Sequence, residues 1–234
     1  MSTTLNTRGP TPGSLRDVVY STLRDEIMNG LIRFGERLTE PKVSARFGIS
    51  RTPAREALAK LCADGLLQRD EVGYSPVRPS ITGIRDLYEL RITLELGGIT
   101  RAITNPEVRH DRELLERERQ RWLDLRTDPP AQEPGFVVVD ESFHVALLTA
   151  SGNPELVSAL TAVNARIRHV RMYDFMVNNR VEVTIAEHLA ILDAVLAEDL
   201  THAYELLRRH IGESLDVVVD RVTRAIVAMT LAAE

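Results

Sequence analysis

The chain has 234 residues, of which 44% are hydrophobic, 27% charged and 5% aromatic. This composition indicates a soluble globular protein of one or two domains and excludes a fibre or a largely disordered chain. The single cysteine, Cys62, excludes an internal disulfide and is typical of a reducing compartment. No apolar run approaches the ~20 residues of a membrane span, so we expect a cytoplasmic protein without a membrane anchor.

The net charge of -5 is unevenly distributed along the chain. Residues 14–79 carry 11 basic and 9 acidic side chains, whereas residues 80–234 carry 17 basic and 25 acidic ones. Such asymmetry can mark a nucleic-acid-binding module joined to a module of another kind. We therefore expect two domains, 14–79 and 80–234, after a flexible tail of residues 1–13 that is rich in Ser, Thr, Pro and Gly.

Three short helices are predicted in the first domain. Apolar residues recur at helical spacing from Ser14 to a stop at Gly30. A second helix follows the cap Thr39 and ends at Gly48. A third follows the cap Ser50, and Pro lies near the start of both later helices, where its missing N–H costs little.

Two short strands, 66–69 and 74–77, are expected around a turn after the third helix. The order of helix, helix-turn-helix and hairpin is that of a winged helix, whose second turn-motif helix enters the DNA major groove. In that helix Arg51 and Arg55 lie on a different stripe from the apolar residues, so both can point away from the core.

The run GISRTPAREAL from Gly48 to Leu58, with GERLTE at 35–40 and DGL at 64–66, resembles the DNA-binding domain of GntR-family bacterial transcription regulators. A single domain of this size makes few base contacts, so we expect a homodimer on a two-fold double-stranded operator. The resemblance implies base and phosphate contacts from the third helix, further phosphate contacts around the second, and a wing tip near the minor groove. The residues concerned are Arg51, Thr52 and Arg55, then Arg37, Lys42 and Arg46, then Gly73.

The second domain has no strand pattern. Helices are expected at 82–104, 107–126, 135–151, 154–178, 180–197 and from Leu200 to the end. These lengths and the short loops between them predict an all-α antiparallel bundle of about six helices. The fold class is therefore mostly α, with a winged helix-turn-helix ahead of the bundle.

Several histidines in the helical domain have surroundings that suit a metal ligand. Asp140 and His144 lie four residues apart, so they share a helix face and could hold one ion. His188 begins an amphipathic run, and His210 lies on a small inward stripe, where a histidine needs a partner or a metal. Any one of them alone is more often a satisfied core or surface histidine.

The helical half resembles the FCD ligand-binding domain of the FadR-type GntR subgroup. The features are ELR at 89–91 with Glu95, DESFH at 140–144, Glu187-His188 and His210. The resemblance implies a divalent ion held by Asp140, His144, His188 and His210. Three imidazoles and a carboxylate suit Zn, Ni, Mn or Co, and an octahedral ion would leave two positions for a carboxylate metabolite.

Arginines are the candidates for binding that carboxylate, because a planar guanidinium matches it. Arg91 is either a clamp of this kind or a salt-bridge partner of Glu95 at i+4, and Arg168, Arg171 and Arg180 are further candidates. The remaining histidines are expected to be structural or solvated, with His110 on a charged helix face. Trp122 is expected to contribute packing.

The sequence therefore predicts a DNA-binding transcription regulator that acts as a repressor. A small carboxylate bound beside a metal is expected to control it. We expect no catalytic residues. One alternative is a metal-dependent enzyme that uses the bundle. Another is a regulator whose metal is purely structural.

Overall fold

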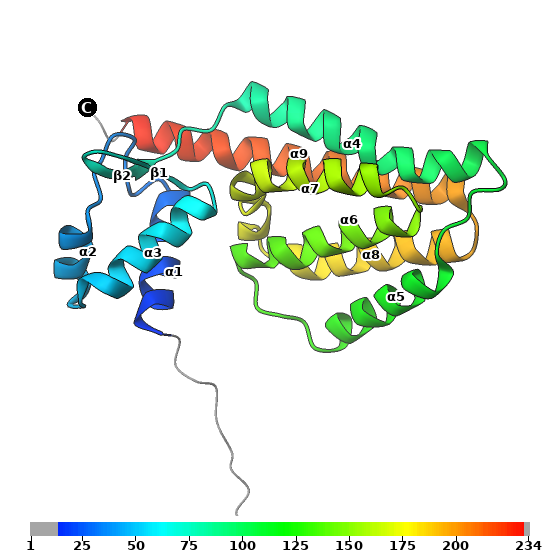
Figure 1. Ribbon diagram of the computed structural model, residues 1–234, viewed down its shortest axis with the longest axis horizontal. Helices are drawn as coiled ribbons and strands as arrows, with labels where there is room; N and C mark the ends of the chain where they lie inside the picture. The colour runs from blue at the N-terminus through cyan, green and yellow to red at the C-terminus, as the bar shows by residue number, and fades with distance from the viewer. Residues whose placement is uncertain (1–13, 232–234) are drawn as a thin grey trace, which may run out of the picture. The chain divides into compact units, whose positions relative to one another are not determined.

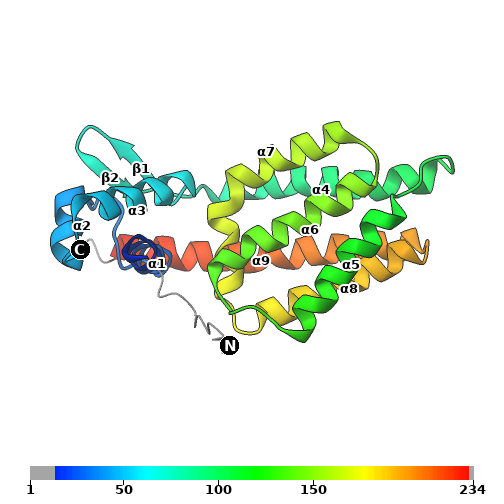
Figure 2. The same ribbon diagram turned by 60° about the horizontal axis from the view of Figure 1, so that its bottom comes forward.

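A computed structural model describes residues 14–231, so the flexible tail expected at residues 1–13 lies outside the described residues (Figures 1 and 2). Two compact units are distinguished by their internal contacts. The second unit extends from Arg78 to Val227, and the other described residues, 14–77 and 228–231 at the end of the last helix, are grouped with the first. The mostly α fold with an N-terminal winged helix-turn-helix is confirmed.

The first unit contains three helices and a two-stranded antiparallel hairpin. Their bounds are α1 Leu15–Met28, α2 Glu40–Phe47, α3 Arg51–Ala63, β1 Leu67–Asp70 and β2 Gly73–Pro76. Both strands lie one residue away from the sequence prediction. Helices α1 and α2 pack on α3, and α3 packs on β1. The core is aliphatic, with Leu23, Leu58 and Leu61 completely buried.

Local chemistry explains where the helices of the turn motif begin and end. The Thr39 hydroxyl accepts a hydrogen bond from the Lys42 backbone N–H, and Gly48 adopts the left-handed conformation that ends α2. Ser50 occupies the N-cap of α3, but its side chain makes no capping hydrogen bond, contrary to the sequence prediction.

The second unit is a bundle of six long helices within the described residues, with two short 3₁₀ turns. The bounds are α4 Ile81–Thr104, α5 Arg112–Thr127, η1 Pro134–Phe136, α6 Val137–Ala150, α7 Pro154–Arg171, η2 Asp174–Met176, α8 Arg180–Leu196 and α9 Leu200–Leu231. Figures 1 and 2 show α6 in the middle of the bundle, with α7 and α5 packed against it. None of the described helices is both long and apolar enough to cross a lipid bilayer.

Two predicted boundaries in this unit were wrong. The helix expected from Glu107 begins only at Arg112, where Asp111 caps it by accepting from the Leu114 N–H. The helix expected to reach Asn178 ends at Arg171 and gives way to η2. In both places the residues continue a pattern that is compatible with a helix, but the backbone does not follow it.

Candidate metal centre and nucleic-acid interface

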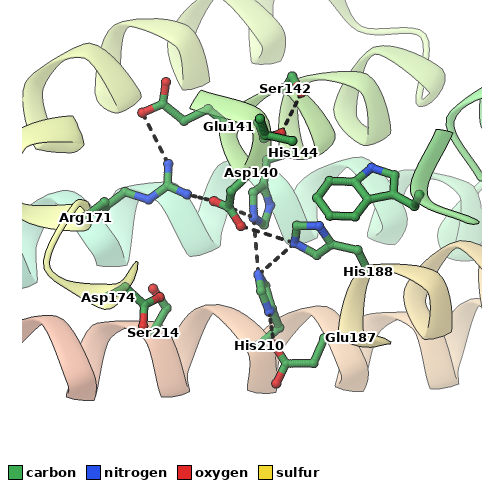
Figure 3. Close-up of polar contacts among 12 residues, drawn as sticks. Asp140, Glu141, Ser142, His144, Arg171, Asp174, Glu187, His188, His210 and Ser214 are labelled. Atoms are coloured by element: carbon green, nitrogen blue, oxygen red, sulfur yellow. Dashed lines mark hydrogen bonds and ion pairs between the residues drawn. The ribbon is translucent and has the colours of Figure 1, made fainter. Parts of the chain in front are cut away.

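The four predicted ligands come together in the middle of the bundle. Asp140 and His144 lie one turn apart on α6, His188 lies on α8 and His210 lies on α9 (Figure 3). All four are buried, and one ligand atom from each lies within 4.8 Å of every other. Helical spacing produces this arrangement, because each residue occupies the inward stripe of its own helix.

The distances between these atoms suit a small cation. The Nε2 atoms of His188 and His210 are 3.2 Å apart, and those of His210 and His144 are 3.3 Å apart. The Asp140 carboxylate lies 3.3 Å from His188 Nε2 and 3.7 Å from His144 Nε2. Ligand atoms on a tetrahedral ion with bonds of about 2.0–2.1 Å are separated by about 3.3–3.4 Å.

Two further carboxylates orient the imidazoles from outside the cluster. His144 Nδ1 lies 2.5 Å from Glu95 on α4, and His210 Nδ1 lies 2.7 Å from Glu187 on α8. Carboxylate partners of this kind fix the tautomer of a metal-binding histidine and leave Nε2 for the metal. The role of Glu187 was not predicted from the sequence. Helical periodicity shows which face of α8 Glu187 occupies, but it does not show that α9 packs against that face.

On its Nδ1 side His188 has aromatic neighbours and no carboxylate. Its ring stacks on the Phe143 ring with centroids 3.6 Å apart. The Trp122 ring packs nearly perpendicular to it, with centroids 4.3 Å apart. Its Nδ1 atom is buried without a hydrogen-bond partner among the described residues. Burial lowers the pKa of His188 well below its ordinary value and also lowers the pKa of His210. Both rings are therefore neutral, as metal ligands must be.

The carboxylates of the centre are ionised. Burial acts to raise the pKa of Asp140, but the Arg171 guanidinium overcomes it and holds that pKa well below its usual range. Burial is likewise overcome at Glu95, where His144 and Arg91 lower the pKa to about 2. An ionised Glu95 can only accept, so His144 Nδ1 carries the proton in the contact between them.

The four arginines proposed to bind an effector are all engaged with carboxylates. Arg91 contacts Glu95 at 2.7 Å, and Arg168 contacts Glu141 at 2.7 Å. The other two reach the centre and its surroundings: Arg171 pairs with Asp140, and Arg180 bridges Asp174 at 3.0 Å and Glu187 at 3.1 Å. The salt bridge considered for Arg91 and Glu95 is present, and it is fully buried instead of exposed.

Three of these arginines nevertheless retain unused donors. Arg91 Nη2, Arg171 Nε and Arg180 Nη2 are buried without a hydrogen-bond partner among the described residues. The amide nitrogen of Asn164, whose oxygen accepts from Arg171 at 3.3 Å, is also unpartnered. Unsatisfied buried donors are costly, so their concentration around one centre points to an acceptor.

The first unit presents a cationic helix face. Arg51, Thr52 and Arg55 lie in the first turns of α3, and all three are exposed. None of their side chains makes a hydrogen bond or ion pair within the described residues, so no described carboxylate pairs with either guanidinium group. The buried Ala54, Ala57, Leu58 and Leu61 hold the opposite face of α3 in the core.

The other predicted phosphate contacts are less free. Arg37 pairs with Asp70 of the hairpin, and Arg46 pairs with Glu26 of α1, with one N–O distance of 2.8 Å. Lys42 donates to the Arg37 carbonyl at 3.2 Å. Phosphates would have to compete with these partners.

Gly73 has a structural role at the start of β2. Its φ is 138°, and a Cβ atom there would lie 2.6 Å from the Leu38 carbonyl oxygen. The next residue, Tyr74, exchanges two backbone hydrogen bonds of 2.8 Å with Leu38. The glycine therefore lets the hairpin close against the turn before α2, while Glu71 and Val72 form the exposed tip.

The position of His110 corrects the sequence analysis. It lies in the loop between α4 and α5, not on a charged helix face, and its Nε2 atom is buried without a hydrogen-bond partner among the described residues. Trp122 packs as expected, since it is fully buried against Phe136 and Phe143.

Two family models match the chain. The model described as bacterial regulatory proteins, gntR family, matches residues 15–73, and the FCD domain model matches residues 86–213. Together they cover both compact units.

Curated relatives agree with these matches. An uncharacterized HTH-type transcriptional regulator, BphR of Paraburkholderia xenovorans, is 30% identical over 88% of this chain and 85% of its own length. The HTH-type transcriptional repressor RspR of Escherichia coli is 28% identical over 83% and 85%. A solved structure of Lar, described as controlling the Listeria monocytogenes agr system, shares the fold with a TM-score of 0.59 and 20% identity, over 92% of this chain and 99% of that one.

Proposed function

The chain belongs to the gntR family of bacterial regulatory proteins and carries an FCD domain, and from this premise we propose that it is a metal-dependent repressor. A small carboxylate would either release this repressor from its operator DNA or keep it bound there. As a member of this family, the protein is a DNA-binding transcription regulator. The matching families and relatives are regulators, not enzymes, which removes the metalloenzyme alternative.

Operator binding is assigned to the exposed face of α3. Arg51 and Arg55 carry charges that no carboxylate of the described chain neutralises, so phosphate or a guanine edge would meet them without first displacing a partner. One such helix reads few bases, and a homodimer on a two-fold operator would double the contacts. We propose this dimer as the cytoplasmic, DNA-bound form.

The opposed imidazoles carry the argument for a metal. His144 and His210 each direct Nδ1 to a carboxylate, so in their neutral forms their Nε2 lone pairs face each other at 3.3 Å. Two lone pairs at this distance repel, and a cation between them turns the repulsion into coordination. Asp140 would supply the anionic ligand, and His188 would complete the set.

Charge balance supports a carboxylate beside that metal. In the helical unit three arginines and four carboxylates are buried, namely Arg91, Arg171 and Arg180 against Glu95, Asp140, Glu141 and Asp174. These seven groups sum to one negative charge. A bound divalent cation would change the sum to one positive charge, and the carboxylate of one ligand would cancel it. The unpartnered guanidinium donors are the groups that would receive its oxygens.

Control of DNA binding would then be a population shift. The winged helices would exist in two arrangements that bind the operator differently. A carboxylate can change the operator affinity by no more than the ratio of its own affinities for these two arrangements. Whichever arrangement binds the operator, metal is required for the response, because the carboxylate site acquires its positive charge from the metal.

The test begins with metal content. Wild type, His188→Ala and the surface variant His202→Ala are purified without added metal and analysed for transition metals. We expect about one ion per chain in wild type and His202→Ala and a sharp loss in His188→Ala. Equal content in all three would contradict the metal assignment.

The second step tests the response. Operator fragments are selected from random DNA with the full protein, and their affinity is measured with acetate, succinate and citrate before and after metal removal. A carboxylate effect that needs metal supports the proposal. Metal-dependent stability with no carboxylate effect would favour the purely structural metal.

A further inference from the structure

A second pocket lies in the helical unit outside the metal centre. It is formed where α4 leads into α5 and α8 turns into α9, at the end of the bundle seen on the right of Figure 1. Its volume is about 160 Å³. Cavities of about 150 Å³ are large enough to hold a benzene-sized molecule. The pocket can therefore take a small organic molecule and not only water.

Most residues that line this pocket are apolar. They come from α4, the α4–α5 loop, α5, α8 and α9, namely Ala102, Val108, Leu115, Val195, Leu196 and Leu200. Ala102, Leu115 and Val195 belong to helices and are buried, so the wall is fixed by the packing of the bundle. The occupant must present an apolar body to it.

The mouth carries one unpaired charge of each sign. The Arg109 side chain makes a single weak hydrogen bond, 3.4 Å to the neighbouring Val108 carbonyl. The Glu198 carboxylate lines the same pocket and makes no hydrogen bond or ion pair within the described residues. They do not pair with each other. The third charged group, Arg112, is already committed to Glu116 at 2.9 Å and to the Leu196 carbonyl at 3.0 Å. A matching ligand therefore brings an anion and a cation together.

Glu198 occupies its place in a backbone conformation that favours glycine. Its φ is 60°, and it directly follows the C-cap residue Ala197, where helices usually carry Gly. A glycine would end α8 with less strain, yet it would leave the mouth without a carboxylate. Glu198 therefore places a negative charge at a position where the backbone conformation by itself favours glycine.

His110 is one of the residues that line this pocket. It also lines a second, tight void together with Glu95 and His144. An occupant of the pocket would thus lie one side chain away from the metal centre, without sharing any of its ligands.

We propose that this pocket is a second small-molecule site, and that its ligand is an apolar α-amino acid. The side chain packs against the Val and Leu wall, the carboxylate faces Arg109, and the ammonium group faces Glu198. A simple carboxylic acid would leave Glu198 repelling it, and a simple amine would meet the same obstacle at Arg109.

Calorimetric titration of the full-length protein tests the proposal with L-valine, L-leucine and L-phenylalanine as probes. Two leucine analogues serve as ligand controls: 4-methylpentanoate lacks the amine, and 3-methylbutylamine lacks the carboxylate. We expect saturable binding of at least one amino acid, and binding at least about tenfold weaker for the analogue that lacks either charge. No saturable binding of any amino acid up to about 10 mM, or equal binding of the analogues, would overturn it.

Three variants localise the site. Arg109→Gln and Glu198→Gly should each weaken amino-acid binding at least about tenfold, while Glu107→Gln, an exposed change in the same loop, should not. Glu198→Gly should also unfold at a higher temperature, because it relieves the left-handed strain, so its loss of binding cannot come from misfolding. Unchanged binding in both pocket variants would refute the assignment, and unchanged metal content in all three separates this site from the metal centre.

Discussion

His144 and His210 present their Nε2 atoms to each other at 3.3 Å, and a carboxylate holds the opposite nitrogen of each ring. The two carboxylates come from different helices, Glu95 from α4 and Glu187 from α8. Four helices of the bundle therefore fix the direction of two lone pairs. Such an arrangement would preorganise the proposed cation site through groups outside the four ligands.

Replacing Glu187 with Gln should weaken metal binding about 10–100-fold. The amide keeps the size of the side chain but removes the charge that favours the proton on His210 Nδ1 at 2.7 Å. Competition with a chromogenic chelator measures the affinity.

The matched control is Glu182→Gln, an exposed change on the same helix. It should leave metal affinity unchanged. If the two variants bind metal alike, Glu187 does not orient His210.

The metal-free protein should lose stability as the pH falls below about 6.5. Burial lowers the pKa of His110, His169, His188 and His210 in the folded state. The unfolded chain takes up protons at these side chains near pH 6.5, before the folded protein does, so protonation favours unfolding. The stability is full above that pH and is lost as the pH falls toward the lowered pKa values.

Urea unfolding of chelator-treated protein between pH 7.5 and 5.5 measures this loss. His188→Phe should flatten the pH dependence by about one proton, because the phenyl ring packs but cannot titrate. A free energy of unfolding that stays constant or rises toward pH 5.5 would rule out this linkage.

The sequence was sufficient to predict most of this architecture, because helix caps and apolar stripes are local signals. Thr39, Gly48 and Asn153 each mark a helix end that the structure contains. The spacing of Asp140 and His144 requires them to share one helix face, whatever the rest of the chain does.

Contacts across helices could not be predicted in this way. Glu187 lies beside His188 in sequence, but it reaches His210 because α8 and α9 are adjacent in space. His110 continues a charged run that suits a helix, and only the packing of the α4–α5 loop against the bundle buries its Nε2 atom. Such contacts depend on which elements pack against each other, and the residue pattern within one segment does not specify that packing.

Arg55→Ala should weaken operator binding by about 1–3 kcal/mol, and Arg46→Ala should weaken it less. Arg55 is exposed without a partner, whereas Arg46 must give up its ion pair with Glu26 before it can serve a phosphate. Gel-shift titration with selected operator DNA measures both variants.

Salt titration supplies the second comparison. Each lost phosphate contact should reduce the slope of log affinity against log salt by about one. A larger effect from Arg46→Ala than from Arg55→Ala would place the interface around α2 instead of α3.

Gly73→Ala should destabilise the winged helix by about 1–3 kcal/mol. The change forces an L-residue into a φ of 138° and places its Cβ 2.6 Å from the Leu38 carbonyl oxygen, so the strand pairing between Leu38 and Tyr74 must open. Gly97→Ala is the control, because it lies in α4 with no atom within 4 Å of the added Cβ, and it should stabilise the protein slightly. Differential scanning calorimetry compares the two variants. If Gly73→Ala lowers operator affinity while its unfolding is unchanged, the glycine acts through DNA contact at the wing and not through the backbone.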